Sequence, residues 1–218
     1  AYSNTGNHEI IVRAKESHRI LVNNLTEIQS SLVNENSLTL LNNMIKKLAS
    51  YGEYIDALAE SREQRDRLID ESMILLADES ARLIVGLKEI ARQENDTSVL
   101  EQTHLISENL LKARMNAISF LGNRKYSFQK SSINSLSLAK EKTIALYQSG
   151  ISSVELNSLL QKLLENISAY EKNFYQAIQA TRDYLFLVNV VMEGEATEFT
   201  TLSMTLKNAT LSTLDIFT

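Results

Sequence analysis

The sequence predicts an all-α protein made of two stacked four-helix bundles, formed by about six helices of which two are long and shared by both bundles. Three observations support this prediction. The 218 residues include no proline and only six glycines, the residues that loops use freely and helix interiors avoid. Apolar residues also recur at alternating steps of three and four, which is the period of one helix face.

The first half of the chain contains three predicted helices. A helix over 5–33 has one apolar face, and the polar segment 34–37 interrupts it. Ser37 is a suitable N-cap for a short helix that ends near residue 48, and Gly52 is interpreted as the turn residue that follows. A long helix then covers about 53–94. The apolar face of the first helix comprises Ile10, Ala14, Ser17 or His18, Leu21, Leu25, Ile28 and Leu32.

The second half begins after the polar segment 95–98, where Ser98 and Glu101 form a candidate capping box. Helices are predicted over 98–121 and 125–148, separated by a break at 122–124. Gly150 ends the second of them, and Ser152 or Ser153 restarts the chain.

The last predicted helix runs from about 153 to the C-terminus and carries a heptad pattern of apolar residues. Gly194 lies where this pattern changes phase, and it indicates either a π-bulge or kink, or close packing of another helix. The heptad face comprises Leu160, Leu163, Ile167, Tyr170, Phe174, Ala177, Thr181, Tyr184, Val188 and Val191.

These helices form four antiparallel passes in one domain, 1–218, and the breaks at 34–37 and 122–124 are expected at matching heights. The breaks would divide the domain into two modules. The membrane-proximal end module is predicted to hold 5–33, 76–95, 98–121 and 185–214, and the membrane-distal far module to hold 37–75 and 125–184.

Composition excludes several classes of function. The net charge is −5 and Lys and Arg are scattered, which argues against a nucleic-acid partner and against a basic membrane-surface helix. The chain has no cysteine, which fits an extracytoplasmic protein without excluding the cytosol. Its three histidines lack metal-ligand spacing and no catalytic motif occurs, so no metal, cofactor or catalytic residue is expected.

Two segments resemble a known family. Ala113-Arg-Met-Asn-Ala-Ile-Ser-Phe-Leu-Gly-Asn-Arg-Lys-Tyr126 is similar to the A-R-R-x-E-K-x-F-L-x-R-x-x-x-K-Y signature of periplasmic helical sensor domains, with Met115 in place of the second arginine. The segment 184–196, YLFLVNVVMEGEA, resembles the Leu-Val-Asn-x-x-Met-x-Gly-x-Ala segment of the helical bimodular (HBM) sensor family.

This resemblance implies a periplasmic ligand-sensing domain of an inner-membrane receptor, either a methyl-accepting chemotaxis protein or a sensor histidine kinase. Such domains are non-catalytic, are expected to be homodimers, and bind small molecules such as organic acids. Transmembrane helices are then expected outside Ala1 and Thr218. The alternatives are a helical module that reads a periplasmic binding protein, and a structural coiled-coil adaptor.

Four candidate ligand-binding residues follow. Arg114 lies at the edge of the core, and the family resemblance places it in the end-module pocket against a ligand carboxylate; otherwise it extends to solvent or pairs with a glutamate. Arg13 flanks the apolar face of the first helix in the same module. Arg182 and Asn189 lie near a polar interruption of the last helix, at Thr181, whose partner is either a ligand or another helix.

Overall fold

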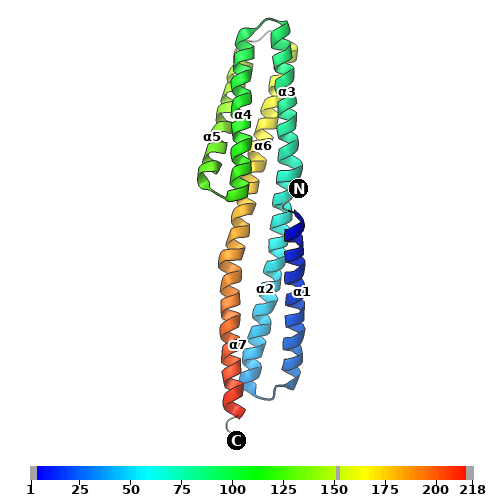
Figure 1. Ribbon diagram of the computed structural model, residues 1–218, viewed down its shortest axis with the longest axis vertical. Helices are drawn as coiled ribbons and strands as arrows, with labels where there is room; N and C mark the ends of the chain where they lie inside the picture. Colours follow the sequence, from blue (N-terminus) through cyan, green and yellow to red (C-terminus); the bar gives the residue numbers. More distant parts are fainter. Residues whose placement is uncertain (1–3, 151–152, 215–218) are drawn as a thin grey trace. The chain divides into compact units, whose positions relative to one another are not determined.

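The computed structural model describes residues 4–150 and 153–214, and every regular element within them is a helix (Figure 1). The predicted all-α class is confirmed. The α-helices are α1 (Asn4–Ser31), α2 (Glu35–Arg67), α3 (Ile74–Gln93), α4 (Thr97–Asn123), α5 (Tyr126–Gln148), α6 (Val154–Phe186) and α7 (Glu193–Leu214). Two π-helical segments, η1 (Leu68–Met73) and η2 (Leu187–Met192), join α2 to α3 and α6 to α7.

The chain divides into two compact units. The three-helix unit consists of Ala1–Glu63 and Arg182–Thr218, and thus contains α1, most of α2, and α7. The four-helix unit consists of Gln64–Thr181 and contains α3, α4, α5 and most of α6.

In the three-helix unit, α1 and α2 form an antiparallel hairpin. The connection of residues 32–34 reverses the chain, and Asn34 caps α2 by accepting a hydrogen bond from the Ser37 backbone N–H at 3.1 Å. Gln29 donates to Asn42 across the hairpin. The hairpin turn thus lies at residues 32–34, and residues 35–37 already belong to α2, where the sequence predicted an interruption at 34–37 within one pass. Polar residues mark the end of a helix, but they do not indicate the direction in which the chain continues.

Gly52 lies inside α2 and is not the predicted turn. The His18 ring occupies the space beside it: a Cβ at Gly52 would lie 2.7 Å from His18 Cε1. The same ring makes a hydrogen bond of 2.7 Å between its Nε2 and the Leu48 carbonyl oxygen. A larger residue at position 52 would therefore displace the His18 ring from this place between α1 and α2.

Helix α7 packs on this hairpin with limited burial. Its half-buried Phe199, Leu202 and Leu206 contact a small core of Leu25, Leu41, Met44 and Leu48. None of the α7 side chains that the structure describes, up to residue 211, is fully buried. The ammonium group of Lys47 on α2 links the two helices through Glu198 at 2.6 Å and Glu195 at 3.3 Å.

The four-helix unit is closely packed. Helix α6 contributes the heptad residues from Leu160 to Thr181, all of them buried as predicted, whereas Tyr184, Val188 and Val191 are only half-buried. Phe174 is fully buried and makes an edge-to-face contact with Phe120 of α4, with ring centroids 6.1 Å apart.

Helices α4 and α5 form a second antiparallel hairpin, shown in green at the turn in Figure 1. Arg124 takes a left-handed conformation with φ of 61° at this turn. The buried Ser132 hydroxyl of α5 donates to the Ala113 carbonyl of α4 at 2.9 Å. The predicted break at 122–124 is therefore also a chain reversal.

The grouping of segments consequently differs from the predicted modules. The segments 76–95 and 98–121 share a core with 125–148 and 153–181, and 37–48 shares one with 5–33 and the C-terminal helix. The physical reason is the two hairpin turns, because each returns the chain along the helix that precedes it.

Helix ends agree in part with the sequence. The N-cap of α4 is Asp96, which accepts from the Val99 N–H at 2.9 Å, and not the predicted Ser98. Gly150 follows α5 with φ of 81°, as expected for the residue after a helix. Ser153 accepts from the Leu156 N–H at the start of α6; Ser152 lies outside the described residues. A Cβ at Gly194 would meet nothing within 4 Å, and η2 ends two residues before it, so the phase change belongs to a π-helical turn and not to close packing.

Candidate ligand cavity

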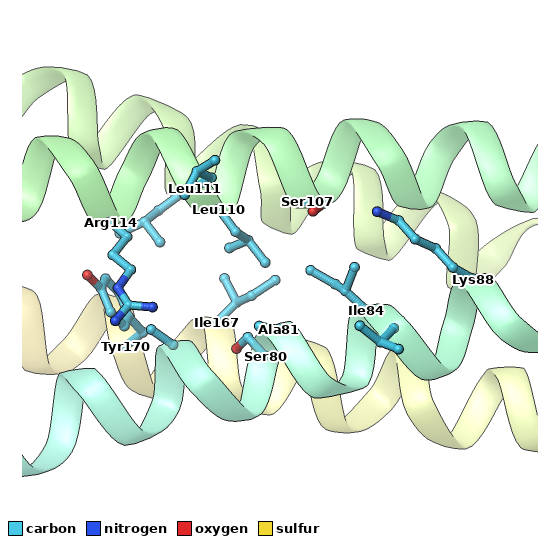
Figure 2. A pocket seen from close by; sticks show the side chains of 13 residues that line it. Ser80, Ala81, Ile84, Lys88, Ser107, Leu110, Leu111, Arg114, Ile167 and Tyr170 are labelled. Atoms are coloured by element: carbon cyan, nitrogen blue, oxygen red, sulfur yellow. The ribbon is translucent and has the colours of Figure 1, made fainter.

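A cavity of about 280 Å³ lies inside the four-helix unit, between α3 and α4 (Figure 2). Helices α5 and α6 complete its floor through Leu136, Ile167 and Tyr170. Its walls are mostly apolar, and its charged groups are confined to Lys88 and Arg114. This combination of an apolar cavity with a few polar groups is typical of small-molecule sites.

The cavity exists because α3 presents small side chains to α4. Ala77, Ser80 and Ala81 occupy successive turns of the facing surface, where larger residues would fill the space. The Ser80 hydroxyl is turned away into its own helix, since it donates to the Leu76 carbonyl at 2.7 Å. Leu111 and Val85 lie exposed at the rim of the cavity, so a ligand can enter from solvent between α3 and α4.

Arg114 and Tyr170 form one end of the cavity. The Arg114 side chain is 37% exposed, and its Nη1 lies 3.0 Å from Oδ1 of Asp78 on α3. Burial raises the pKa of the Tyr170 hydroxyl to about 12, although the nearby Arg114 charge opposes this shift. Tyr170 is therefore a neutral hydrogen-bond donor at any physiological pH.

Lys88 and Ser107 form the other end (Figure 2). Both are half-buried, and Lys88 makes no ion pair with any residue that the structure describes. Glu101 and Lys88 line a neighbouring hollow together, but they are not in ion-pair contact.

Both cations can reach the cavity because of helix geometry. Side chains on a helix lean toward its N-terminus. Since α3 and α4 are antiparallel, Lys88 on α3 and Arg114 on α4 lean toward each other from opposite ends. The Lys88 side chain accordingly extends toward Ser107 in Figure 2.

The structure places only one of the four sequence-predicted site residues at this cavity. Arg114 lines it, in the four-helix unit. Arg13 is on α1 in the three-helix unit, with its side chain 76% exposed and paired with Glu9. Arg182 and Asn189 are exposed and also belong to the three-helix unit.

The polar interruption at Thr181 has a local explanation. Its buried hydroxyl donates to the Ala177 carbonyl one turn earlier, at 2.7 Å. The hydroxyl is thus satisfied within α6, and it requires neither the ligand nor the partner helix that were expected.

Sequence analysis did not single out Lys88, Ser107 and the small residues of α3. Lys88 lies on a helix face of mixed polarity, so the sequence alone gives no reason to distinguish it from an ordinary exposed lysine. The available signal was the Ala77–Ser80–Ala81 spacing, which leaves room beside a neighbouring helix but becomes informative only when the facing helix is known.

The family-like segment 113–126 contributes mainly to packing. Ala113 and Ala117 are fully buried, and Phe120 contacts Phe174. Arg114 alone of this segment lines the cavity, while Tyr126 is exposed. Much of the resemblance therefore reflects the core of α4 and the turn that follows.

Comparison of the chain with models of known protein families and with curated protein sequences finds no match. Among the residues that the structure describes, no group of three or more metal-ligating side chains is placed to hold a metal ion. None of the described helices combines the length and apolar character needed to cross a membrane.

Proposed function

We propose that this chain is the ligand-sensing domain of a transmembrane signalling receptor, and that a small organic anion binds the cavity between α3 and α4. One observation carries the proposal. The cavity combines apolar walls with two cations, and its floor includes Ile167 and Tyr170 of α6. Helix α6 then continues without a break past Thr181 into the three-helix unit.

This connection gives ligand binding a route to the rest of the chain. A ligand that contacts α3, α4 and α6 favours the helix arrangement to which it binds more tightly, and it shifts the population only by that difference in affinity. The displacement would pass along α6 to α7. The domain itself performs no chemistry in this proposal.

The resemblance of residues 113–126 and 184–196 supports a more specific setting. It favours the periplasmic domain of a chemoreceptor or sensor histidine kinase, acting as a homodimer. Sequencing the regions that flank residues 1 and 218 in the full-length protein tests this setting. Apolar segments of about 20 residues on both sides are expected, and their absence would contradict it.

The direct test of ligand binding is a thermal-shift screen with organic acids, amino acids and amines. A ligand at 100 times its Kd stabilises the protein by about 2.7 kcal/mol, which raises Tm by about 5–10 °C in a chain of this size. We expect organic acids to produce such a shift, and amines not to.

A cavity-filling variant locates the effect. Ala81→Leu places a larger side chain in the cavity and should abolish the shift, whereas Ala145→Leu, on an exposed part of α5 away from the cavity, should keep it. If no acid raises Tm at millimolar concentration, direct binding of an organic anion is rejected. A shift that survives in Ala81→Leu would place the ligand elsewhere.

A further inference from the structure

We infer that the anion is a linear monocarboxylate with an apolar chain of about eight carbon atoms, and that its carboxylate binds Lys88 and Ser107 while its tail extends toward Arg114. The inference rests on the proposed function, since it names the ligand class of the same cavity. It differs from the sequence-based expectation by assigning the carboxylate to Lys88 and not to Arg114.

The charges of the cavity favour one negative charge on the ligand. Arg114 is already balanced by Asp78 at 3.0 Å, whereas Lys88 has no acidic partner among the described residues. The two cations and one carboxylate leave a net charge of +1. A monoanion neutralises this charge, whereas a dianion would leave an unbalanced negative charge in a partly desolvated site, which is costly.

Ser107 provides a hydrogen bond at the same end. Some buried hydroxyl groups of this unit are satisfied within their own helix, as in Thr143, which donates to the Ala139 carbonyl at 2.7 Å, whereas the buried Thr103 hydroxyl has no partner among the described residues. The Ser107 hydroxyl likewise makes no hydrogen bond with any residue that the structure describes. It is therefore available to donate to a carboxylate oxygen, and Lys88 extends toward it in Figure 2.

The middle of the cavity matches an apolar chain. Ile84, Leu110 and Ile167 lie between the two polar ends, and no charged side chain lies among them. Ser107 and Arg114 are two helical turns apart on α4, about 10 Å, which an extended chain of roughly eight carbon atoms spans. The cavity of about 280 Å³ also exceeds the roughly 150 Å³ that accommodates a benzene molecule in a protein core.

The test is isothermal titration of the whole chain with straight-chain acids of two to twelve carbons. Each CH₂ that enters the cavity should tighten binding about fourfold. Octanoate should therefore bind roughly 250-fold more tightly than butanoate, and the gain per carbon should stop beyond about ten carbons. Octylamine, of the same length and opposite charge, should not bind.

Two matched variants separate the two cations. Lys88→Met removes the charge while keeping an unbranched chain, and it should weaken octanoate binding at least 30-fold. Arg114→Met should weaken it less than fivefold. Ser107→Ala should give an intermediate loss, and circular dichroism of each variant checks that it remains folded.

The outcomes distinguish the inference from the proposed function. If short, polar or dicarboxylic acids bind as tightly as octanoate, or if Arg114→Met abolishes binding while Lys88→Met does not, the inference is wrong and the sensor proposal stands. If no organic acid binds at all, the monocarboxylate inference and the proposed binding of an organic anion are both rejected. Equal binding of octanoate by wild type and Lys88→Met would indicate adsorption to apolar surface and would also reject the inference.

Discussion

The two units bury their apolar residues to very different degrees. In the three-helix unit, the fully buried apolar residues that the structure describes are Leu25, Leu41, Met44, Leu48 and Ile55, and the rest of the buried apolar core belongs to the four-helix unit. The four-helix unit surrounds α6 on several sides, whereas α7 contacts its neighbours along one half-buried stripe. Stability and ligand binding should therefore reside mainly in the four-helix unit.

The largest expected difference concerns aromatic residues of the two cores. Phe174→Ala empties a fully buried position that contacts Phe120, and it should reduce the free energy of unfolding by about 3–5 kcal/mol. Phe199→Ala, at a half-buried position of α7, should cost about half as much. Urea denaturation of both variants measures the difference, and equal losses would contradict the comparison.

Tyr170 gives the four-helix unit a specific sensitivity to alkaline pH. Because its folded pKa of about 12 is above the ordinary value of 10.0, the folded state retains the proton that the unfolded state has released. Stability should thus fall as pH rises from 10 to 12, by up to about 3 kcal/mol. Tyr170→Phe should remove this dependence in urea denaturation, and wild type and variant should behave alike below pH 9. An unchanged alkaline profile would show that other groups cause it.

Two helical glycines of the three-helix unit should respond differently to alanine. Gly194→Ala should stabilise the chain by about 1 kcal/mol, since a methyl group there meets nothing within 4 Å. Gly52→Ala should lack this gain, because the new Cβ displaces His18 from its bond to the Leu48 carbonyl.

A double-mutant cycle isolates the effect of His18. In a His18→Ala background the contact is absent, and Gly52→Ala should then stabilise by about 1 kcal/mol, as at Gly194. If Gly52→Ala changes the stability equally in the wild-type and His18→Ala backgrounds, the His18 contact is not the cause of the missing gain.

The smallest expected effect concerns Lys47, which joins α2 to α7 through two glutamates. The hydrogen bonds that Lys47 donates to Glu198 and Glu195 raise its pKa above the ordinary value, so the pairing stabilises the fold at neutral pH and is lost as pH rises through the folded pKa. Lys47→Met should lower Tm slightly at low ionic strength. This loss of Tm should vanish at 1 M salt, because the Debye length there is about 3 Å and the ion pairs are screened. As a control, Ser132→Ala removes a buried hydrogen bond, and its effect on Tm should not depend on salt.

Helix content and the heptad core of α6 were predictable because each rests on local periodicity. The buried positions from Leu160 to Thr181 follow directly from steps of three and four. Which helices pack together was not predictable in the same way. The polar residues near 34 and near 123 mark helix ends whether the chain reverses or continues, and the sequence does not distinguish these outcomes.

The candidate site was predictable only at Arg114. Its position at the edge of the α4 core is visible in the sequence, but Lys88 becomes significant only through the facing helix. Gly52 was misinterpreted for a related reason, because a glycine that permits a close approach has the same local signature as one that ends a helix.

The π-helical segment Leu187–Met192 is a place where the chain can lose one residue without losing its helical structure. A π-turn closes its hydrogen bond over one residue more than an α-turn does. Removing a single residue between 187 and 192 can therefore convert the segment to regular α-helix while both flanking helices remain helical. The same deletion in the middle of α6 would rotate every later residue of the Leu160–Thr181 core away from its neighbours. Single-residue length variation among descendants of this sequence should accordingly concentrate at η2 and at η1, where the helix already contains an extra residue.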